Sequence, residues 1–520
     1  MLRASKKAME KKSDNLIERP PVVAVMGHID HGKSTLLDYI RKTNVVEKEA
    51  GGITQAISAY EVMHKDEEGK DRKITFLDTP GHASFSKMRE RGAQVADIAI
   101  LIVSAEDGVK PQTIEAKNTI EESGTPYLVV INKIDKPGAN IEKTKQELAE
   151  NEVYLENYGG KIPCAEISAK TGEGVDNLLS LINIMALMEN FTGDPGKEAA
   201  GFVIEANLDP RRGIEATLII KDGTLRKGMC AACGESVGST NIMENFLGKS
   251  VSEASFSSPV RLVGWSKLPA VGSQFKSFSS KREAEKCATE EKSKMDEARK
   301  KENGLAASSE TEEGADASNK KIIPIVLKAD TLGSIEAIEK EIAGIKRDGA
   351  EFRIVQKGVG PISEFDIKTV SFPENTLVVG FNVKTDKSAM EISQQKGIKI
   401  SLFDIIYKLT EWLETEISER EPKKDAEEIL GRAKVLKIFS RTKEKQVLGG
   451  KVLEGKISAN GAIRIMRRDF EIGRGRVANL EKNRAKTGEV EEGAEFGMML
   501  DSKTEIASGD ILEFFSVNAR

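Results

Sequence analysis

Residues 27–34 read Gly-His-Ile-Asp-His-Gly-Lys-Ser and match the G-x-x-x-x-G-K-[ST] phosphate loop. The apolar run 21–26 precedes this loop and a helix-like segment, 35–40, follows it, which is the strand–loop–helix setting that the motif requires. Backbone N–H groups of such a loop surround phosphate oxygens at a helix N-terminus, the lysine adds a cation and the serine hydroxyl can bind Mg²⁺. The chain is therefore expected to bind a nucleoside triphosphate.

Two later segments select the base of that nucleotide. Asn132-Lys133-Ile134-Asp135 follows the strand-like run 127–131, and the Asp135 carboxylate can accept both the ring N–H and the exocyclic N–H of guanine, which adenine does not offer together. Ser168-Ala169-Lys170 resembles the second guanine-binding element of GTPases, with the Ala169 N–H toward the base oxygen and Lys170 along the ring. These patterns predict GTP.

A third segment supplies groups for the γ-phosphate. Asp78-Thr79-Pro80-Gly81 follows the strand-like run 74–77, so that Asp78 can join a magnesium shell and the Gly81 N–H can sense the γ-phosphate. His82 comes next and occupies the place where other GTPases use Gln to orient the attacking water. We favour catalysis for His82, whereas for His28 and His31 we favour packing within the phosphate loop.

These segments, taken with two others, resemble a translational GTPase. The others are Ala50-Gly51-Gly52-Ile53-Thr54-Gln55 and Ala105-Glu106-Asp107-Gly108-Val109-Lys110-Pro111-Gln112-Thr113. The first of these, and the order of all the segments, are similar to bacterial translation initiation factor two, over roughly residues 19–520. The resemblance implies a GTPase that hydrolyses GTP to GDP and phosphate under stimulation by the ribosome.

The resemblance also assigns roles to single residues. It implies that Thr54 binds Mg²⁺ in the GTP state and that Ile29 and Ile53 form an apolar gate before His82. Release of Thr54 after hydrolysis would disorder the segment around it. Ser34, Thr54 and Asp78 are then the expected magnesium ligands. The expected nucleotide-binding residues are Gly27, His28, Ile29, Asp30, His31, Gly32, Lys33, Ser34, Thr35, Asp78, Gly81, Asn132, Lys133, Asp135, Ser168, Ala169 and Lys170.

Partners follow from the resemblance alone. It implies a monomeric factor that binds formyl-methionyl initiator tRNA, places it on the 30S ribosomal subunit, promotes joining of the 50S subunit and leaves after hydrolysis. A GTP-dependent RNA- or ribosome-binding scaffold with little turnover is the alternative of another class, and the presence of Thr54 and His82 argues against it. A factor of the elongation factor Tu or G type is the nearest rival within the class.

Composition is consistent with a cytoplasmic protein. Four cysteines are too few for a disulfide framework and suggest a reducing compartment. Cys230 and Cys233 form one C-x-x-C, but no second pair or nearby histidine completes a zinc site, so we favour ordinary residues of a strand and turn. The sequence has no apolar stretch of membrane-spanning length and no signal peptide.

Charge is distributed unevenly although the net charge is −5. Residues 432–486 contain 16 Lys and Arg against five Asp and Glu. A basic surface can bind RNA phosphates, but a charge run is more often just a solvated face, and the family resemblance favours RNA. The expected initiator tRNA contacts are Phe439, Arg464, Arg467, Lys482, Arg484, Glu495, Phe496 and Gly497.

Periodicity and turn residues divide the chain into α/β and β parts. We expect a P-loop GTPase domain with a doubly wound sheet, a β-barrel, a small α/β domain, a long connecting helix, whose later part the resemblance places between domains, and a C-terminal β-barrel that binds initiator tRNA. The expected ranges are 1–18 for a basic N-terminal tail, 19–193 for the GTP-binding domain, 198–280 for the first barrel, 281–321 for a helix with a flexible insertion, 322–401 for the small α/β domain, 402–425 for the connecting helix and 428–520 for the last barrel.

Two departures from the family limit what the resemblance implies. Only about 20 residues precede the first strand, so the chain looks like a short form that lacks the family's long N-terminal region, and contacts of that region are not expected. In the last barrel, Lys451 and Phe496 stand where the family usually has Cys, and Glu481-Lys482-Asn483 stands where it usually has Lys-Arg-Phe. The formyl-methionine pocket is narrowed if both Lys451 and Phe496 line it and survives if both point outward.

Overall fold

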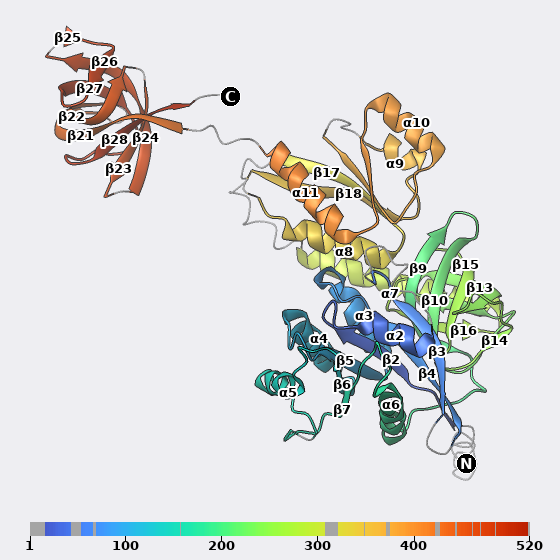
Figure 1. The fold of residues 1–520 in the computed structure, drawn as a ribbon. Helices are drawn as coiled ribbons and strands as arrows, with labels where there is room; N and C mark the ends of the chain where they lie inside the picture. The colour runs from blue at the N-terminus through green and yellow to red at the C-terminus, as the bar shows by residue number, and fades with distance from the viewer. Residues whose placement is uncertain are drawn as a thin grey trace, which may run out of the picture. The chain divides into compact units, whose positions relative to one another are not determined.

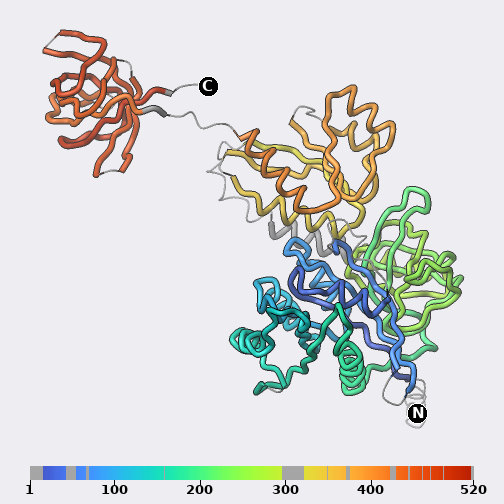
Figure 2. The backbone as a smooth tube through the Cα atoms, in the orientation of Figure 1, coloured from blue at the N-terminus to red at the C-terminus, as the bar shows by residue number. Residues whose placement is uncertain are grey.

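The computed structural model divides into two compact units, residues 1–420 and 421–520, and Figure 2 traces the backbone of both. The structure describes residues 16–42, 54–65, 69–156, 158–306, 321–347, 349–370, 375–421, 427–442, 445–459, 461–468, 470–483 and 485–517. Most of the predicted N-terminal tail, the 50–53 part of the predicted switch, and Arg484 therefore lie outside the described residues.

The first domain is built on a six-stranded sheet of order β3-β4-β2-β5-β6-β7, in which only the edge strand β3 runs antiparallel to its neighbour. Apolar clusters cover both faces of this sheet, as a parallel sheet requires. The strands are β2 (Val22–Gly27), β3 (Ser58–Lys65), β4 (Asp71–Asp78), β5 (Ile98–Ser104), β6 (Tyr127–Asn132) and β7 (Cys164–Glu166), and the helices are α2 (Lys33–Arg41), η3 (Ala83–Phe85), α3 (Ser86–Val95), α4 (Pro111–Ser123), α5 (Ile141–Glu150) and α6 (Val175–Glu189).

The second domain is a closed barrel of order β10-β15-β13-β12-β16-β9. Alternating buried residues of its strands form one apolar core around Phe275 and Trp265. A two-residue pair, β1 (Ile17–Glu18) with β8 (Thr192–Gly193), lies at the junction with the first domain. The barrel strands are β9 (Ala200–Asp209), β10 (Gly213–Asp222), β12 (Cys230–Cys233), β13 (Ser236–Asn245), β15 (Pro259–Trp265) and β16 (Gln274–Phe278), with β11 (Leu225–Arg226) paired to β14 (Glu253–Ala254).

A long helix, α7 (Lys281–Ala306), follows the barrel. Within the range 281–321, we expected the flexible insertion to occupy residues 303–319. The helix continues through residues 303–306, so this expectation was wrong at its start; residues 307–320 are outside the described part of the chain. Among the helices that the structure describes, none is both long enough and apolar enough to cross a membrane.

The third domain is a small parallel sheet of order β18-β17-β19-β20 with helices between its strands (Figure 1). Its last helix, α11, begins at Ile406, so the prediction of a helix from residue 402 was wrong at its N-terminal end. Leu402 belongs to β20, because Val379 and Phe381 of the neighbouring strand β19 extend the sheet to Phe403. The elements are β17 (Lys321–Ala329), α8 (Leu332–Gly344), β18 (Ala350–Val359), α9 (Glu364–Lys368), β19 (Leu377–Phe381), α10 (Lys387–Lys396), β20 (Ile400–Phe403) and α11 (Ile406–Arg420).

The small α/β domain packs against the GTPase domain. Helix α8 lies against η3 and α3 (Figure 1), and Phe85 and Met88 of the GTPase domain share one apolar core with residues of α8 and α11. An ion pair of 2.6 Å joins Arg91 on α3 to Glu336 on α8. The segment after the predicted γ-phosphate motif is thus buried between two domains.

The second unit is also a closed barrel. Its path β21-β28-β23-β24-β27-β22 is closed because β21 pairs with β22 as well. Inward residues such as Leu448, Leu500 and Phe514 form its core. The strands are β21 (Glu427–Arg441), β22 (Lys445–Ser458), β23 (Ala462–Arg467), β24 (Phe470–Lys482), β25 (Ala485–Lys486), β26 (Glu489–Glu491), β27 (Glu495–Asp501) and β28 (Ile511–Val517). The expected fold class, an α/β GTPase domain with two barrels and a small α/β domain, is confirmed.

Glu205 on β9 gives a prediction about stability and pH. Burial raises the pKa of Glu205 to about 8, and the nearby carboxylate of Asp330 acts in the same direction. A raised pKa means that the folded state binds more protons than the unfolded state, so stability should fall as the pH rises from about 4.5 to 8. We expect Glu205→Gln to remove this fall and to stabilise the protein at pH 9, by an amount on the order of a few kcal/mol.

Thermal unfolding of the full chain from pH 5 to pH 9 measures this effect. Glu414→Gln, which changes an exposed carboxylate on α11, is the matched control and should retain the parental pH dependence. Equal pH dependence in Glu205→Gln and the parent would contradict the prediction.

Candidate nucleotide-binding and hydrolysis site

The phosphate loop needs glycine at two positions. Gly27 has φ of 145°, and a Cβ there would lie 2.4 Å from the carbonyl oxygen of Ile102. Gly32 has φ of 89°, and a Cβ there would lie 2.3 Å from Nδ2 of Asn132. Both contacts are too short for any side chain, so the loop can follow this path only with these residues.

Lys33 begins α2 and is buried inside the loop. Its Nζ donates to the carbonyl oxygens of Gly27 at 3.0 Å and His28 at 2.7 Å. Burial lowers the pKa of Lys33 to about 8, opposed by the carboxylate of Asp78 and assisted by Arg89. An anionic phosphate beside this ammonium group would favour its charged form.

The three expected magnesium ligands meet at the start of α2. The Ser34 Oγ and Thr54 Oγ1 atoms are 3.0 Å apart, and the Thr54 hydroxyl donates to Asp78 Oδ2 at 3.5 Å. Thr54 and Asp78 are both buried. Two hydroxyl oxygens and one carboxylate are hard oxygen donors of the kind that Mg²⁺ prefers, so the residues fit the ion.

One buried side chain, Asn132, joins the phosphate loop to the guanine loop. Its Nδ2 donates to the carbonyl oxygen of His31 at 2.8 Å, and its Oδ1 accepts from the Ala169 N–H at 2.9 Å. The Ser168 hydroxyl donates to Asp135 Oδ1 at 2.7 Å and lowers the pKa of this carboxyl group. The Asp135 carboxylate is therefore held ionised and aligned as an acceptor.

Two other expected contacts have different surroundings. The Lys133 ammonium group pairs with Asp107 Oδ2 at 3.0 Å, and Lys170 is exposed on the rim of a cavity of about 810 Å³ that Thr35 and Ala169 also line. This cavity is on the guanine side of the site.

His28 and His31 pack against each other in the loop. Their ring centroids are 4.9 Å apart at an interplanar angle of 68°. His31 is fully buried, and burial lowers its pKa to about 3, assisted by His28. The burial of His31 and its ring contact with His28 agree with our interpretation that these side chains pack within the loop.

His82 lies beside the phosphate loop and faces the small α/β domain. A Cβ on the preceding residue, Gly81, would lie 2.4 Å from Lys33 Nζ, so the two segments are in contact. The His82 ring meets the Tyr407 ring edge-on, with centroids 4.4 Å apart and an interplanar angle of 87°. Burial lowers the pKa of His82, and the carboxylate of Glu341 opposes that shift.

Sequence reasoning missed several residues at this site. The Gln55 side chain donates to the carbonyl oxygen of Asp404 at 2.9 Å and accepts from the Ile406 N–H at 3.2 Å. Gln112 accepts from the Ile29 N–H at 3.2 Å. Both glutamines lie in segments that carried the family resemblance, so a signal was present for them, whereas nothing in the local sequence indicated Glu341 or Tyr407.

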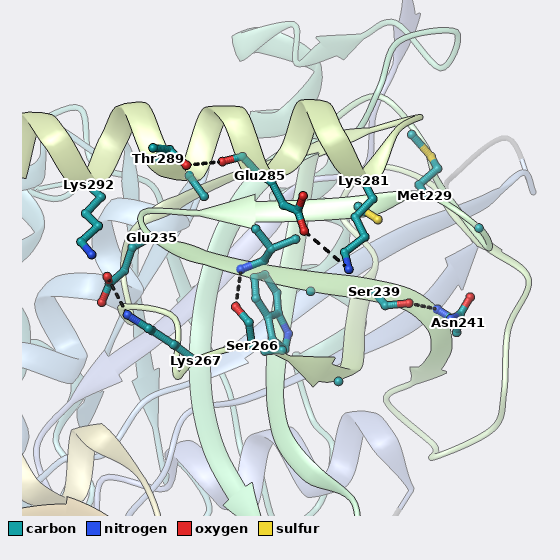
Figure 3. A pocket seen from close by; sticks show the side chains of 17 residues that line it. Met229, Glu235, Ser239, Asn241, Ser266, Lys267, Lys281, Glu285, Thr289 and Lys292 are labelled. Atoms are coloured by element: carbon teal, nitrogen blue, oxygen red, sulfur yellow. Dashed lines mark hydrogen bonds and ion pairs between the residues drawn. The ribbon is translucent and has the colours of Figure 1, made fainter.

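A larger cavity lies away from these motifs. It has a volume of about 990 Å³ and is enclosed by β12, β13, β15 and the start of α7 (Figure 3). Four of its five charged lining residues form ion pairs, Lys267 with Glu235 at 2.9 Å and Lys281 with Glu285 at 3.5 Å; the fifth is Lys292. None of the predicted nucleotide-binding residues lines it, so this cavity is not the nucleotide site.

The expected tRNA surface is less positive than its sequence suggests. Arg467 forms two hydrogen bonds with Asp510, at 2.9 and 2.8 Å, and Arg464 pairs with Glu471 at 3.0 Å. The fold thus brings acidic residues beside both arginines, although the Arg467 side chain is still 42% exposed; their contact with tRNA stays a prediction. Lys482 is exposed.

Phe496 and Lys451 point to opposite sides of the last barrel. Phe496 is buried in the core, directly beneath its strand partner Gly450, whereas Lys451 is exposed. We expected either that both residues line the formyl-methionine pocket or that both point outward. The structure matches neither alternative, because one side chain points inward and the other outward. On the outside of the barrel, the Phe439 side chain is 65% exposed and lies over Gly449. The strand partner of Gly449 is Gly497, and the space where a Gly497 side chain would lie is open. Glu495, two residues before Gly497, is exposed.

Comparison with family models assigns a class to this fold and site. Residues 18–187 match the elongation factor Tu GTP binding domain, residues 198–278 match elongation factor G domain 2, and residues 294–414 match translation-initiation factor 2. The chain is therefore a translational GTPase, an enzyme that hydrolyses GTP.

Curated relatives identify the family. The chain is 39% identical over 502 residues to translation initiation factor IF-2 of Anoxybacillus flavithermus, covering 96% of this chain and 69% of that protein. It is 39% identical over 506 residues to IF-2 of Bacillus cytotoxicus, covering 97% of this chain and 73% of that protein. The chain belongs to the translation initiation factor IF-2 family and acts as an initiation factor in protein synthesis.

Among solved structures, GDP-bound aIF5B from Aeropyrum pernix is 27% identical and covers 96% of this chain and 92% of that one, with a TM-score of 0.43.

Asp135 provides a test of the guanine site. Asp135→Asn turns one acceptor into a donor that faces the donors of guanine, so GTP binding should weaken by at least about tenfold, while xanthosine triphosphate should bind better. Competition binding with the two nucleotides measures the change. Asp107→Asn, which removes the nearby partner of Lys133, is the control and should leave the base preference as it was. An unchanged GTP preference in Asp135→Asn would show that the guanine site lies elsewhere.

Proposed function

We propose that this initiation factor binds GTP with Mg²⁺, carries formyl-methionyl initiator tRNA, places it on the 30S subunit, promotes joining of the 50S subunit and leaves after hydrolysis. The observation that carries the catalytic part is the meeting of Ser34, Thr54 and Asp78 beside Lys33. We further propose that it acts as a monomer in the cytoplasm.

Each group of residues in the site has its own role in binding and hydrolysis of GTP. Ser34, Thr54 and Asp78 would hold the magnesium ion, which supplies charge stabilisation to the phosphates when bound. Lys33 and the loop N–H groups bind the outer phosphates, and the Gly81 N–H donates to the γ-phosphate. His82, which follows Gly81, orients the attacking water. Asp135 and the Ala169 N–H select guanine.

Thr54 is the residue through which the nucleotide state would be sensed. Its hydroxyl contacts both other expected ligands, and the next residue, Gln55, is bonded to the segment that begins α11. Loss of the γ-phosphate would weaken the binding of Thr54 to the magnesium ion and allow its segment to move away. This coupling gives GTP hydrolysis a route to the rest of the factor.

His82→Ala tests the catalytic assignment. The variant should bind GTP almost as well as the parent, because His82 is not expected to contact the base or ribose, yet hydrolyse it at least about a hundredfold more slowly on ribosomes. Single-turnover assays on 70S ribosomes measure the rate. His64→Ala, on strand β3, is the histidine control. Parental turnover in His82→Ala would make His82 structural and would favour the scaffold of low turnover.

The formyl-methionine contact is proposed for the surface around Phe439, Gly449 and Gly497. An exposed aromatic ring beside two glycines offers apolar area and accessible backbone groups, which suit an unbranched thioether side chain and a formyl oxygen. Phe496 supports the barrel from inside rather than filling this surface. Lys451 adds a charge on the outer face.

We expect initiator tRNA binding to be retained with weak discrimination for the formyl group, because phosphate contacts contribute independently of that group. Affinity should fall at least about tenfold between 50 and 200 mM salt, and Lys451→Ala should reduce the salt dependence. Binding of formylated and unformylated methionyl-tRNA across a salt series measures both. Lys456→Ala, exposed on the same strand, is the control. A large formyl preference with a flat salt dependence would refute this model.

A further inference from the structure

Helix α8 of the small α/β domain holds the segment that carries His82. Lys340 Nζ donates to the Ala83 carbonyl oxygen at 2.8 Å and contacts Ser86 Oγ at 2.8 Å. Between these two contacts, the Ser84 hydroxyl donates to Glu341 Oε1. Three consecutive contacts thus come from two residues that are more than 250 positions away in the sequence.

The Glu341 carboxylate is fixed at both oxygens. Its Oε2 accepts from Thr410 Oγ1 of α11 at 3.3 Å, while its Oε1 binds Ser84, which is only 3% exposed. The neighbouring Phe85 is buried in the core that the small α/β domain shares with this segment. Glu341 and Ser84 therefore meet at the contact between the small α/β domain and the GTPase domain.

The Ser84 hydroxyl also contacts Nδ1 of His82. The hydroxyl has one proton, so when it donates to Glu341 its lone pairs face the imidazole, and Nδ1 must present an N–H. The Ser84 backbone N–H, 3.2 Å from the same nitrogen, favours the opposite arrangement, in which Nδ1 accepts. The charge on Glu341 therefore decides which arrangement is more stable.

We propose that Glu341 is a positioning residue for His82: through the Ser84 hydroxyl, its carboxylate orients the imidazole and holds a proton on Nδ1. This inference rests on the proposed role of His82 in hydrolysis. It makes the small α/β domain a contributor to the hydrolytic site.

Other groups around His82 act against or alongside Glu341. Arg89 on α3 and Lys340 on α8 disfavour a positive imidazole, Glu115 on α4 favours it, and the edge-on ring of Tyr407 limits rotation. Glu341 opposes the effect of burial more strongly than Glu115 does. A protonated ring next to Gly81 would place positive charge where negative charge develops on the γ-phosphate.

Nitrogen NMR of the full-length chain labelled with ¹⁵N-histidine tests the inference directly. The chain has only four histidines, and His82→Ala assigns the signal of His82. In Glu341→Gln, which keeps the side-chain shape, the pKa of His82 should fall by about half a unit or more, and Nδ1 should move toward the shift of an acceptor. Ser84→Ala should change the same signal.

Glu336→Gln is the matched control, because Glu336 lies on the same helix and pairs with Arg91 across the same domain contact, away from Ser84. It should leave the His82 signal at its parental position. A His82 pKa in Glu341→Gln within about 0.1 unit of the control would overturn the inference.

Hydrolysis gives a second readout. Hydrolysis should depend on pH around the pKa of His82, falling as the pH rises if the protonated imidazole is active and rising if the neutral imidazole is active. In either case Glu341→Gln should shift this limb of single-turnover hydrolysis on 70S ribosomes to lower pH. An unshifted limb would overturn the positioning role. If the NMR shift appears while His82→Ala keeps parental turnover, the Glu341–Ser84–His82 contact stands and the proposed catalytic role of His82 fails.

Discussion

The side-chain amide of Asn132 is the contact on which the nucleotide site depends. It is buried at the end of β6 and bonds to the phosphate loop with its nitrogen and to the guanine loop with its oxygen. The loops after β2, β4 and β6 leave the sheet at the same edge because these strands are parallel. Asn132 fixes the spacing between the phosphate loop and the loop of Ala169, and its proximity is one reason that residue 32 is glycine.

The GTPase domain does not complete its switch segments alone. Gln55 is bonded to both sides of the start of α11, and Ser84 and Phe85 are bound by the small α/β domain. These contacts replace water around short irregular segments with fixed partners, which lowers their conformational freedom. Gln55, the residue after the proposed magnesium ligand Thr54, and Ser84, close to His82, are therefore both bound by the small domain.

In the last barrel, two arginines of the basic region form ion pairs within the barrel. Arg464 and Arg467 bond to acidic residues brought beside them by strand pairing and the adjoining loops. A pair of this kind gains little at the surface, but it reduces the positive potential available to a phosphate. The surface that we propose for tRNA consequently combines exposed Lys482 and Lys451 with an exposed aromatic ring, Phe439.

The sequence by itself determined the phosphate loop, the choice of guanine and the class of each domain, because these depend on consecutive residues and on periodic burial. It misplaced the start of α11, since helical periodicity at Leu402 yields to pairing with a neighbouring strand. Only the tertiary structure decided that Glu341 meets Ser84 and that Phe496 faces inward. Both depend on how distant segments pack. The local sequence predicts neither which side chains meet across a domain contact nor the strand register that sets which face of the barrel a residue occupies.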